Sequence, residues 1–286
     1  MAEIFAMSRC SLRRLILRPR FFVSLLLAFG CVWLAYSDVP PYLAERGYQL
    51  QAAEPFLLLL PSVSTQILLL ISFLLLVGDV PFLYPGLETT AMRSSKRKWL
   101  AAQLLAALGA ALLWLLLVLV FTLLPFGKHL SLKNEWSVLL KSVARTGVDP
   151  MSLGMRLIDG PGSALFACST PYLRLAEAFL LQALLLWSLT LWSLAFNLWT
   201  RRSYGCMLTV GFWVLRLNVT ELELRYQRDM TVISPFDLVD LCKQRLTLAR
   251  AGFIVLFFLL QICVLWLLSA LRLRRTDLTG RSEIEI

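Results

Sequence analysis

The fold of this chain is decided by residues 99–126, which read WLAAQLLAALGAALLWLLLVLVFTLLPF. This run holds no charged residue and exceeds the roughly 17–25 residues that a helix needs to cross the hydrocarbon core of a bilayer. Five further apolar blocks occur in the chain, at residues 21–37, 56–78, 172–199, 206–219 and 249–271. We therefore expect six membrane-spanning helices.

The overall composition agrees with a membrane protein. Hydrophobic residues make up 58% of the 286 residues and charged residues 16%, against about 45–50% and about 25% in soluble domains. The formal net charge is +10, and the basic residues lie mainly in short segments beside the apolar blocks. In these positions Lys and Arg set the orientation of spans and meet anionic lipid headgroups. We expect the lipid bilayer as a partner and no nucleic acid.

The distribution of Lys and Arg predicts the orientation. Basic residues are denser in the first 20 residues, in the 79–98 and 200–205 segments and after residue 271 than in the other three loops. The positive-inside rule then places both termini in the cytoplasm. The sequence predicts an all-α, multi-pass protein of the cell membrane, with an N-terminal segment 1–20, a six-span domain 21–271 and a cytoplasmic tail 272–286.

The N-terminal segment has the pattern of an amphipathic helix. At 100° per residue its apolar side chains fall on one arc and its arginines on the other. The apolar arc holds Ile4, Phe5, Leu12, Leu15 and Ile16, and the basic side holds Arg9, Arg13, Arg14 and Arg18. Such a helix lies in the membrane interface as an elbow before the first span. The alternative is a disordered basic leader that only orients this span.

The second apolar block contains Pro61, followed closely by Ser62, Ser64, Thr65 and Gln66. Proline interrupts helical hydrogen bonding, and polar side chains inside a membrane compensate for the backbone groups that are released. The sequence therefore predicts a kink at Pro61 whose freed backbone groups are covered by these side chains.

The loop from residue 79 to residue 98 has an acidic start, an apolar middle and a basic end. It opens with Asp79-Val-Pro81-Phe82 and closes with Arg93-Ser-Ser-Lys96-Arg97-Lys98-Trp99, which leads directly into the third span. Anchored by two spans, such a loop is suited to docking on a cytoplasmic partner. The alternative is a positively charged loop that only sets the orientation.

The predicted outer side contains two notable segments. In loop 127–171, apolar residues at helical spacing from Trp136 to Val143 predict an amphipathic helix on the membrane or on the span ends, with a substrate lid as the less favoured reading. The moderately apolar stretch 230–241, broken by Pro235, predicts an outer re-entrant segment covered by other spans. Arg216 is expected to snorkel to the interface, with substrate contact as the alternative.

Catalytic and metal-binding patterns are not found in this sequence, which has one histidine and six cysteines without metal-ligand spacing. A disulfide between Cys168 and Cys242 is possible, although burial of both as small apolar residues is favoured. Arg174 and Glu177 are expected to pair on one helix face. Since we expect no carboxylate at mid-membrane, any transport would draw its energy from elsewhere, most naturally from a separate ATPase subunit.

Several of these segments together resemble bacterial permease subunits of type 2, exporter-like ABC transporters. The resemblance rests on Asp79-x-Pro81-Phe82, Arg93-Ser94, Arg97-Lys98-Trp99 with Gln103, Asn134-Glu135-Trp136 and Ile233-Ser234-Pro235-Phe236. The order of predicted elements resembles the family over nearly the whole chain, whereas the 45-residue outer loop is longer than a minimal permease needs.

The resemblance implies a dimeric permease bound to two cytoplasmic ATP-binding subunits, which carry the ATP and Mg, while this chain binds no cofactor of its own. It assigns contact with the ATPases to two regions. One is the elbow helix, with Arg9, Arg13 and Arg14. The other is the 79–98 loop and the residue after it, where the positions that contact the ATPases, here called the coupling positions, are Asp79, Pro81, Phe82, Arg93, Arg97 and Trp99. Two other functions stay open. One is a non-transporting membrane module for immunity, sensing or assembly. The other is a membrane enzyme that would depend on a residue such as Glu177 or Asp79.

Overall fold

The computed structural model describes residues 1–81, 95–146, 151, 154–158, 163–166, 170–200, 202–226, 233–242 and 246–275. The first half contains α1 (Ala2–Ile16), α2 (Pro19–Tyr36), α3 (Val39–Arg46), β1 (Leu50–Gln51), α4 (Glu54–Leu59), α5 (Val63–Val77) and α7 (Lys96–Leu123). The second half contains η1 (Gly127–His129), β2 (Leu130–Ser131), α8 (Val138–Thr146), η3 (Ser163–Phe166), α9 (Pro171–Thr200), α10 (Gly205–Tyr226), α11 (Pro235–Leu238) and α12 (Leu248–Arg275).

Four helical stretches are long and apolar enough to cross a membrane: Pro19–Arg46, Lys96–Leu123, Pro171–Thr200 and Leu248–Leu273. They coincide with four of the six predicted spans, and the all-α class is confirmed. The other two blocks have a different form. Block 56–78 is divided into α4 and the 15-residue α5, and block 206–219 lies inside α10, which also carries charged residues. Six spans therefore stays a prediction.

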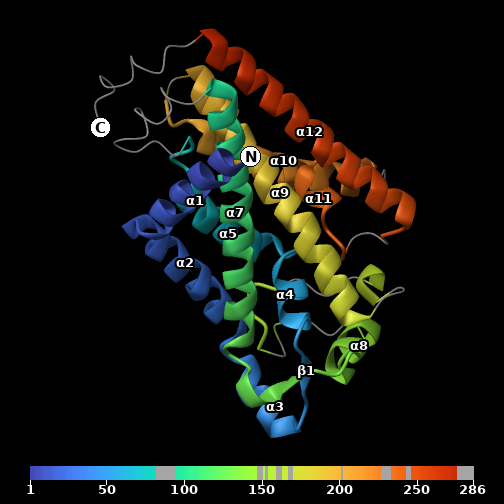
Figure 1. The fold of residues 1–286 in the computed structure, drawn as a ribbon. Coiled ribbons are helices and arrows are strands. Elements are labelled where there is room, and N and C mark those ends of the chain that lie inside the picture. Colours follow the sequence, from blue (N-terminus) through green and yellow to red (C-terminus); the bar gives the residue numbers. More distant parts are fainter. Residues whose placement is uncertain are drawn as a thin grey trace.

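The long helices pack against one another at different angles (Figure 1). α2 packs on α5, α7 on α9, and α9 on α12. Hydrogen bonds join α2 to α5, because Ser24 Oγ donates to Ser72 O at 2.7 Å and Ser72 Oγ donates to Ser24 O at 2.7 Å. Trp114 Nε1 of α7 donates to Ser72 Oγ at 3.2 Å. Such bonds hold helices together where the apolar lipid gives no hydrophobic drive for association.

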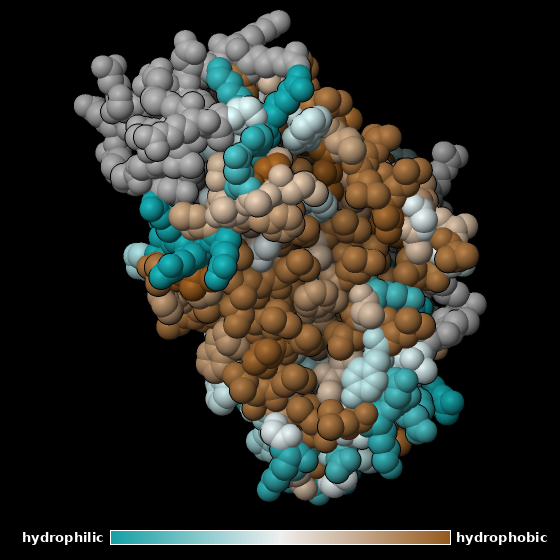
Figure 2. All heavy atoms as spheres, viewed as in Figure 1, coloured by the Kyte–Doolittle hydropathy of each residue, from teal (hydrophilic) through white to brown (hydrophobic). Residues whose placement is uncertain are grey.

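The surface agrees with a membrane location. Figure 2 shows a broad hydrophobic band across the middle of one face, with hydrophilic residues gathered toward both ends. Exposed large apolar side chains are frequent along the long helices, among them Leu26 of α2, Leu116 of α7 and Leu260 of α12. In water this much exposed apolar surface would promote association, whereas lipid tails cover it at no cost.

One end of the bundle carries the small elements. α3, β1 and α8 lie together at the lower end in Figure 1, and β1 pairs with β2 in parallel. The amphipathic helix predicted around residues 136–143 is confirmed as α8, whose buried side chains are Leu139, Leu140 and Val143. The N-terminus and the end of α12 lie toward the opposite end.

The predicted N-terminal helix is confirmed as α1, and it packs against α7. Its buried residues Met7, Ser11 and Leu15 follow one another at four-residue spacing, which places them on one stripe of the helix. Gly109 leaves room for Leu12, since a Cβ at this glycine would lie 3.3 Å from the leucine side chain. The apolar side of α1 is therefore used against α7, and an elbow position in the membrane interface stays a prediction.

Candidate functional site

A broken helix lies in the interior of the bundle, where Pro61 separates α4 from α5. Proline lacks the backbone N–H that a continuous helix requires. Ser62 adopts an extended conformation, with φ −64° and ψ 128°, before α5 begins at the next residue. The break leaves carbonyl oxygens at the end of α4 without their usual helical donors.

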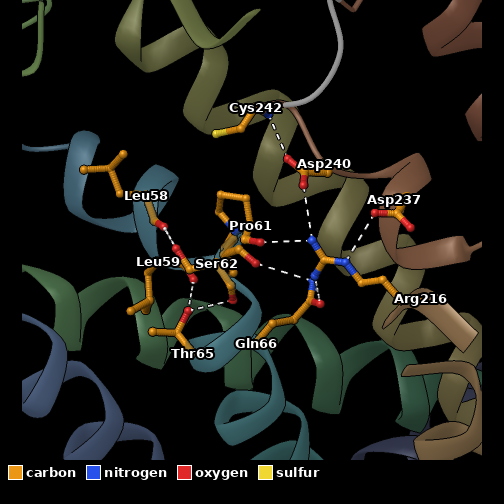
Figure 3. Close-up of polar contacts among 11 residues, drawn as sticks. Leu58, Leu59, Pro61, Ser62, Thr65, Gln66, Arg216, Asp237, Asp240 and Cys242 are labelled. Atoms are coloured by element: carbon orange, nitrogen blue, oxygen red, sulfur yellow. Dashed lines mark hydrogen bonds and ion pairs between the residues drawn. The ribbon is translucent and has the colours of Figure 1, made fainter. Parts of the chain in front are cut away.

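Side chains at the start of α5 supply donors to these carbonyls (Figure 3). Ser62 Oγ donates to Leu58 O at 3.1 Å, Thr65 Oγ1 to Leu59 O at 2.5 Å, and Gln66 Nε2 to Leu60 O at 3.4 Å. The predicted kink is thus confirmed, and three of the four polar residues named for it cover the backbone. Ser64 is the exception, because it is exposed.

The remaining carbonyl of the break, that of Pro61, accepts a hydrogen bond from Arg216 of α10. Arg216 Nη2 lies 3.0 Å from this oxygen, and Nη1 donates to Gln66 Oε1. Two carboxylates complete the cluster: Asp237 lies 3.3 Å from Arg216 Nε, and Asp240 lies 3.3 Å from Nη2 (Figure 3). The guanidinium therefore joins the broken helix to α11 and the turn that follows it.

This cluster is buried. The exposed fraction is 1% for Arg216, 0% for Asp237 and 7% for Asp240. The expectation that Arg216 snorkels to the interface is wrong, since its fork of N–H groups is used inside the bundle. A buried guanidinium is tolerable only when it is paired and hydrogen-bonded, and the two carboxylates and two carbonyl-type oxygens meet this requirement.

Asp237 lies in α11, a four-residue helix whose residues are all buried, and Asp240 lies just after it. Pro235 starts this helix after the extended Ser234, and α11 packs against α10. The backbone around Pro235 is thus covered by protein, as predicted for this segment. Asp237 and Asp240 place two carboxylates in the bundle interior, and both come from the segment between two apolar blocks. The expectation that no carboxylate lies at mid-membrane stays a prediction.

Two adjacent cavities adjoin the cluster, each of about 20 Å³. Both are lined by Leu60, Gln66, Gln182 and Phe236. Asp240 contributes to the first cavity, and Trp114 with leucines of α5, α7 and α9 contributes to the second. The first cavity therefore has a carboxylate in a mainly apolar lining, and the second has no charged residue in its lining.

A second buried acid, Glu54, lies at the end of the bundle that carries α8, just before apolar block 56–78. Its Oε2 accepts from the backbone N–H of Gln51 at 3.0 Å, and its Oε1 from that of Ser137 at 2.6 Å. Burial raises the pKa of Glu54 to about 7, in spite of these two N–H donors. Glu54 thus ties α4 to the segment that begins α8.

The coupling positions inferred from the resemblance lie in different surroundings. Asp79 forms ion pairs with Arg18, at 3.3 Å, and with Arg20. Pro81 is buried, as is Trp99 with 1% of its surface exposed, whereas Arg97 is exposed in the first turn of α7. Phe82 and Arg93 lie outside the described residues.

The chain beside Asp79 is held by Asn197 of α9. Asn197 Nδ2 donates to Val80 O at 2.6 Å, and its Oδ1 accepts from Gly205 N at 2.7 Å. Gly205 is required for this approach, because a Cβ there would lie 2.5 Å from Ser193 O. One amide thus fixes the end of the α5 segment to α9 and to the start of α10.

The N-terminal segment contacts both sides of the 79–98 loop. Arg18 and Arg20 pair with Asp79 at its start, and Lys98 Nζ lies 2.7 Å from Glu3 Oε2 at its end. This ion pair lowers the pKa of the Glu3 carboxyl, with the Lys98 hydrogen bond as the main cause. The predicted basic positions Arg9, Arg13 and Arg14 are exposed on α1.

The remaining expectations concern an ion pair, a disulfide and metal binding. The pairing of Arg174 with Glu177 is confirmed, with 2.9 Å between Nη1 and Oε2. The disulfide between Cys168 and Cys242 stays a prediction, because Cys168 lies outside the described residues. Within the part of the chain that is described, no group of three or more His, Cys, Asp or Glu is placed to hold a metal ion.

Sequence reasoning missed the assembly of the interior site, although a signal was present. The segment Ser234-Pro235-Phe236-Asp237 combines a helix start with an acid, and Asp240 follows three residues later in an otherwise apolar stretch. A membrane segment that keeps two acids needs a cationic partner. Arg216, the one charged residue within block 206–219, was the residue to match with them.

Comparison of the chain with protein-family models, with curated proteins and with solved structures gave no match.

Proposed function

We infer that this chain is the membrane-spanning permease subunit of an ABC transporter and is driven by ATP hydrolysis in a separate cytoplasmic subunit. The observation that carries the proposal is the ionic cluster at the broken helix. Ionisable groups in the interior of a membrane bundle are costly and usually functional, and discontinuous helices commonly form the binding site of transporters. Arg216, Gln66 and Asp240 combine these features beside two cavities.

The geometry of the opposite region supports the coupling part of the proposal. The N-terminal segment is ion-paired to both ends of the 79–98 loop, through Asp79 and through Lys98. A partner that pushes on this loop would therefore also move α1, and through Asn197 it would act on α9 and α10. α10 carries Arg216, so a continuous set of contacts connects the proposed docking region with the interior site.

In this proposal the chain works in the cell membrane with both termini in the cytoplasm and with a second permease chain. ATP and Mg belong to the partner ATPase, and this chain itself is not an enzyme. The resemblance described above supports the dimer and the ATPase partner, and the apolar surface of the long helices supports the membrane location.

Co-purification tests the proposal. The full chain is expressed with its neighbouring genes, purified in detergent and analysed by mass spectrometry, and we expect an ATP-binding subunit to accompany it. The double variant Arg93→Glu, Arg97→Glu should reduce recovery of that subunit several-fold, because it reverses the basic end of the loop. Lys133→Glu is the matched control, since Lys133 is exposed in the outer loop after β2.

Two results would contradict this function. Absence of any ATP-binding protein from the wild-type preparation removes the ABC permease assignment. Equal recovery of the ATPase by the double variant and by Lys133→Glu removes the coupling role of the loop. A transport assay in vesicles distinguishes a permease from a non-transporting membrane module. ATP-dependent movement of a cargo by the complex of this chain with its ATPase identifies a permease, and its absence identifies a non-transporting module.

A further inference from the structure

Gln182 of α9 is a buried amide that lines both interior cavities. Only 7% of its surface is exposed, and its side chain makes no hydrogen bond with the described residues. An amide in this position offers one acceptor and two donors, and leaving them unused in an apolar interior is costly. This amide therefore offers hydrogen bonds to a polar group in the cavities.

The first cavity determines the charge of that ligand. Asp240 is the charged residue among its lining residues, and the amides of Gln66 and Gln182 are the polar ones beside it. The guanidinium of Arg216 contacts Asp240 from outside this lining (Figure 3). A compartment that presents a carboxylate and amide oxygens favours a hydrogen-bond donor with positive charge.

The second cavity determines the rest of the ligand. It shares Gln66 and Gln182 with the first, and its other lining residues are apolar, with Trp114 as the largest. Each cavity measures about 20 Å³, which holds roughly one or two water-sized groups. The two compartments together suit about four heavy atoms, one of them charged.

We propose that these two adjacent cavities together bind a short primary alkylammonium group, with its ammonium beside Asp240 and Gln182 and its carbon chain against Trp114. The proposal deepens the proposed function, because it names the chemical class that the interior site of the permease accepts. It also gives Gln182 a role, as a polar residue that lines both cavities.

Thermal unfolding of the purified full chain in detergent tests this inference, with n-propylammonium chloride as the probe. A ligand that binds the folded state raises the unfolding temperature in a saturable way. We expect such a rise for propylammonium, and none for 1-propanol or for sodium chloride at the same concentration. An equal rise with 1-propanol would show simple apolar partitioning, and an equal rise with sodium chloride would show a salt effect or a bare cation site. Either result would overturn the proposal.

Variants locate the site. Gln182→Leu should weaken propylammonium binding about 10–100-fold, the range expected for loss of a hydrogen bond to a charged group. Gln261→Leu in α12 is the matched control and should bind as the wild type does. Asp240→Asn should abolish binding, and its unfolding temperature without ligand shows whether the variant is folded. Unchanged binding by Gln182→Leu contradicts the proposal.

This test is independent of the ATPase. Loss of amine binding with the ATP-binding subunit still present would overturn only the ligand assignment. Saturable amine binding by a chain that recovers no ATP-binding subunit would overturn only the ABC permease function.

Discussion

Two Arg–Asp contacts in this protein have the same length and opposite surroundings. Arg18 and Asp79 lie 3.3 Å apart with 36% and 40% of their side chains exposed, whereas Arg216 and Asp237 lie 3.3 Å apart with 2% and 0% exposed. When an exposed ion pair forms, its charged groups give up contacts with water for contact with each other, so the pair stabilises the fold by only about 0–1 kcal/mol. A buried pair has lost its water altogether, so removing one partner leaves an uncompensated charge. The effect of each contact on the stability of the fold therefore depends on its burial.

The comparison assigns different tasks to the two regions. The exposed pairs at Asp79 and Lys98 join the 79–98 loop to the N-terminal segment 1–20 with little net stabilisation. The buried cluster fixes the broken helix to α10 and α11, and it can change only if the bundle opens. In the proposed permease, the first kind of contact would yield to a partner and the second would keep the interior site defined.

The largest expected change in the free energy of unfolding comes from removing the arginine of the buried cluster. Arg216→Ala should lower the free energy of unfolding by about 3–5 kcal/mol, because two buried carboxylates lose their cation. Denaturation in detergent micelles measures this change. Arg202→Ala, at an exposed position just before α10, should change stability by less than about 0.5 kcal/mol.

A variant without charges in the cluster tests whether the unpaired buried carboxylates cause this loss of stability. Arg216→Met combined with Asp237→Leu and Asp240→Leu should recover much of the lost stability, because no charge is then buried. If Arg216→Ala and Arg202→Ala are equally stable, the interior ion pairs do not support the fold.

Glu54 is intermediate between the exposed pairs and the buried cluster, because it is a buried acid whose oxygens accept hydrogen bonds from backbone N–H groups. Because burial raises its folded pKa from 4.5 to about 7, the folded state binds this proton more tightly than the unfolded state does. Stability should therefore fall as the pH rises from about 4.5 to about 7, by at most about 3 kcal/mol from this group. Unfolding temperature measured across this range checks the prediction.

Glu54→Gln provides the comparison for this slope. The variant cannot ionise, so the pH dependence between about 4.5 and about 7 should become flatter. Glu45→Gln, at an exposed position of α3, should keep the wild-type slope. A wild-type slope in Glu54→Gln would show that another group titrates.

The smallest effect on stability is expected at the exposed end. Asp79→Asn should change the free energy of unfolding by less than about 1 kcal/mol, since its pairs with Arg18 and Arg20 are partly exposed. In the proposed permease, its recovery of the ATP-binding subunit should nevertheless decrease, because the N-terminal segment and the loop are no longer joined at that end. A loss of stability as large as that of Arg216→Ala would contradict the distinction between the two regions.

Much of the fold could be predicted from local sequence. Helices α7, α9 and α12 follow from long apolar runs, α1 and α8 from apolar residues at helical spacing, and the break at Pro61 from the chemistry of proline. Even the covering of the break by Ser62, Thr65 and Gln66 was predictable, since these donors lie within a few residues of the carbonyls they reach.

The interior site could not be predicted in the same way. Arg216 and Gln66 are 150 residues apart along the chain, Asp240 is farther still from Gln66, and no local pattern predicts that the three meet. The sequence also made Arg216 look like an interfacial residue, because a single arginine near the end of a short apolar block usually reaches water.

The sequence by itself determined the membrane class, the long apolar helices and the two polar ends, because each depends on the transfer of contiguous apolar segments out of water. Only the tertiary structure decided that Arg216, Asp237 and Asp240 share one buried cluster, that Gln182 borders two cavities and that residues 1–20 are tied to both ends of the 79–98 loop. These features depend on which helix faces pack together, and in a bundle whose helices are apolar on most sides, packing geometry rather than periodicity makes that choice.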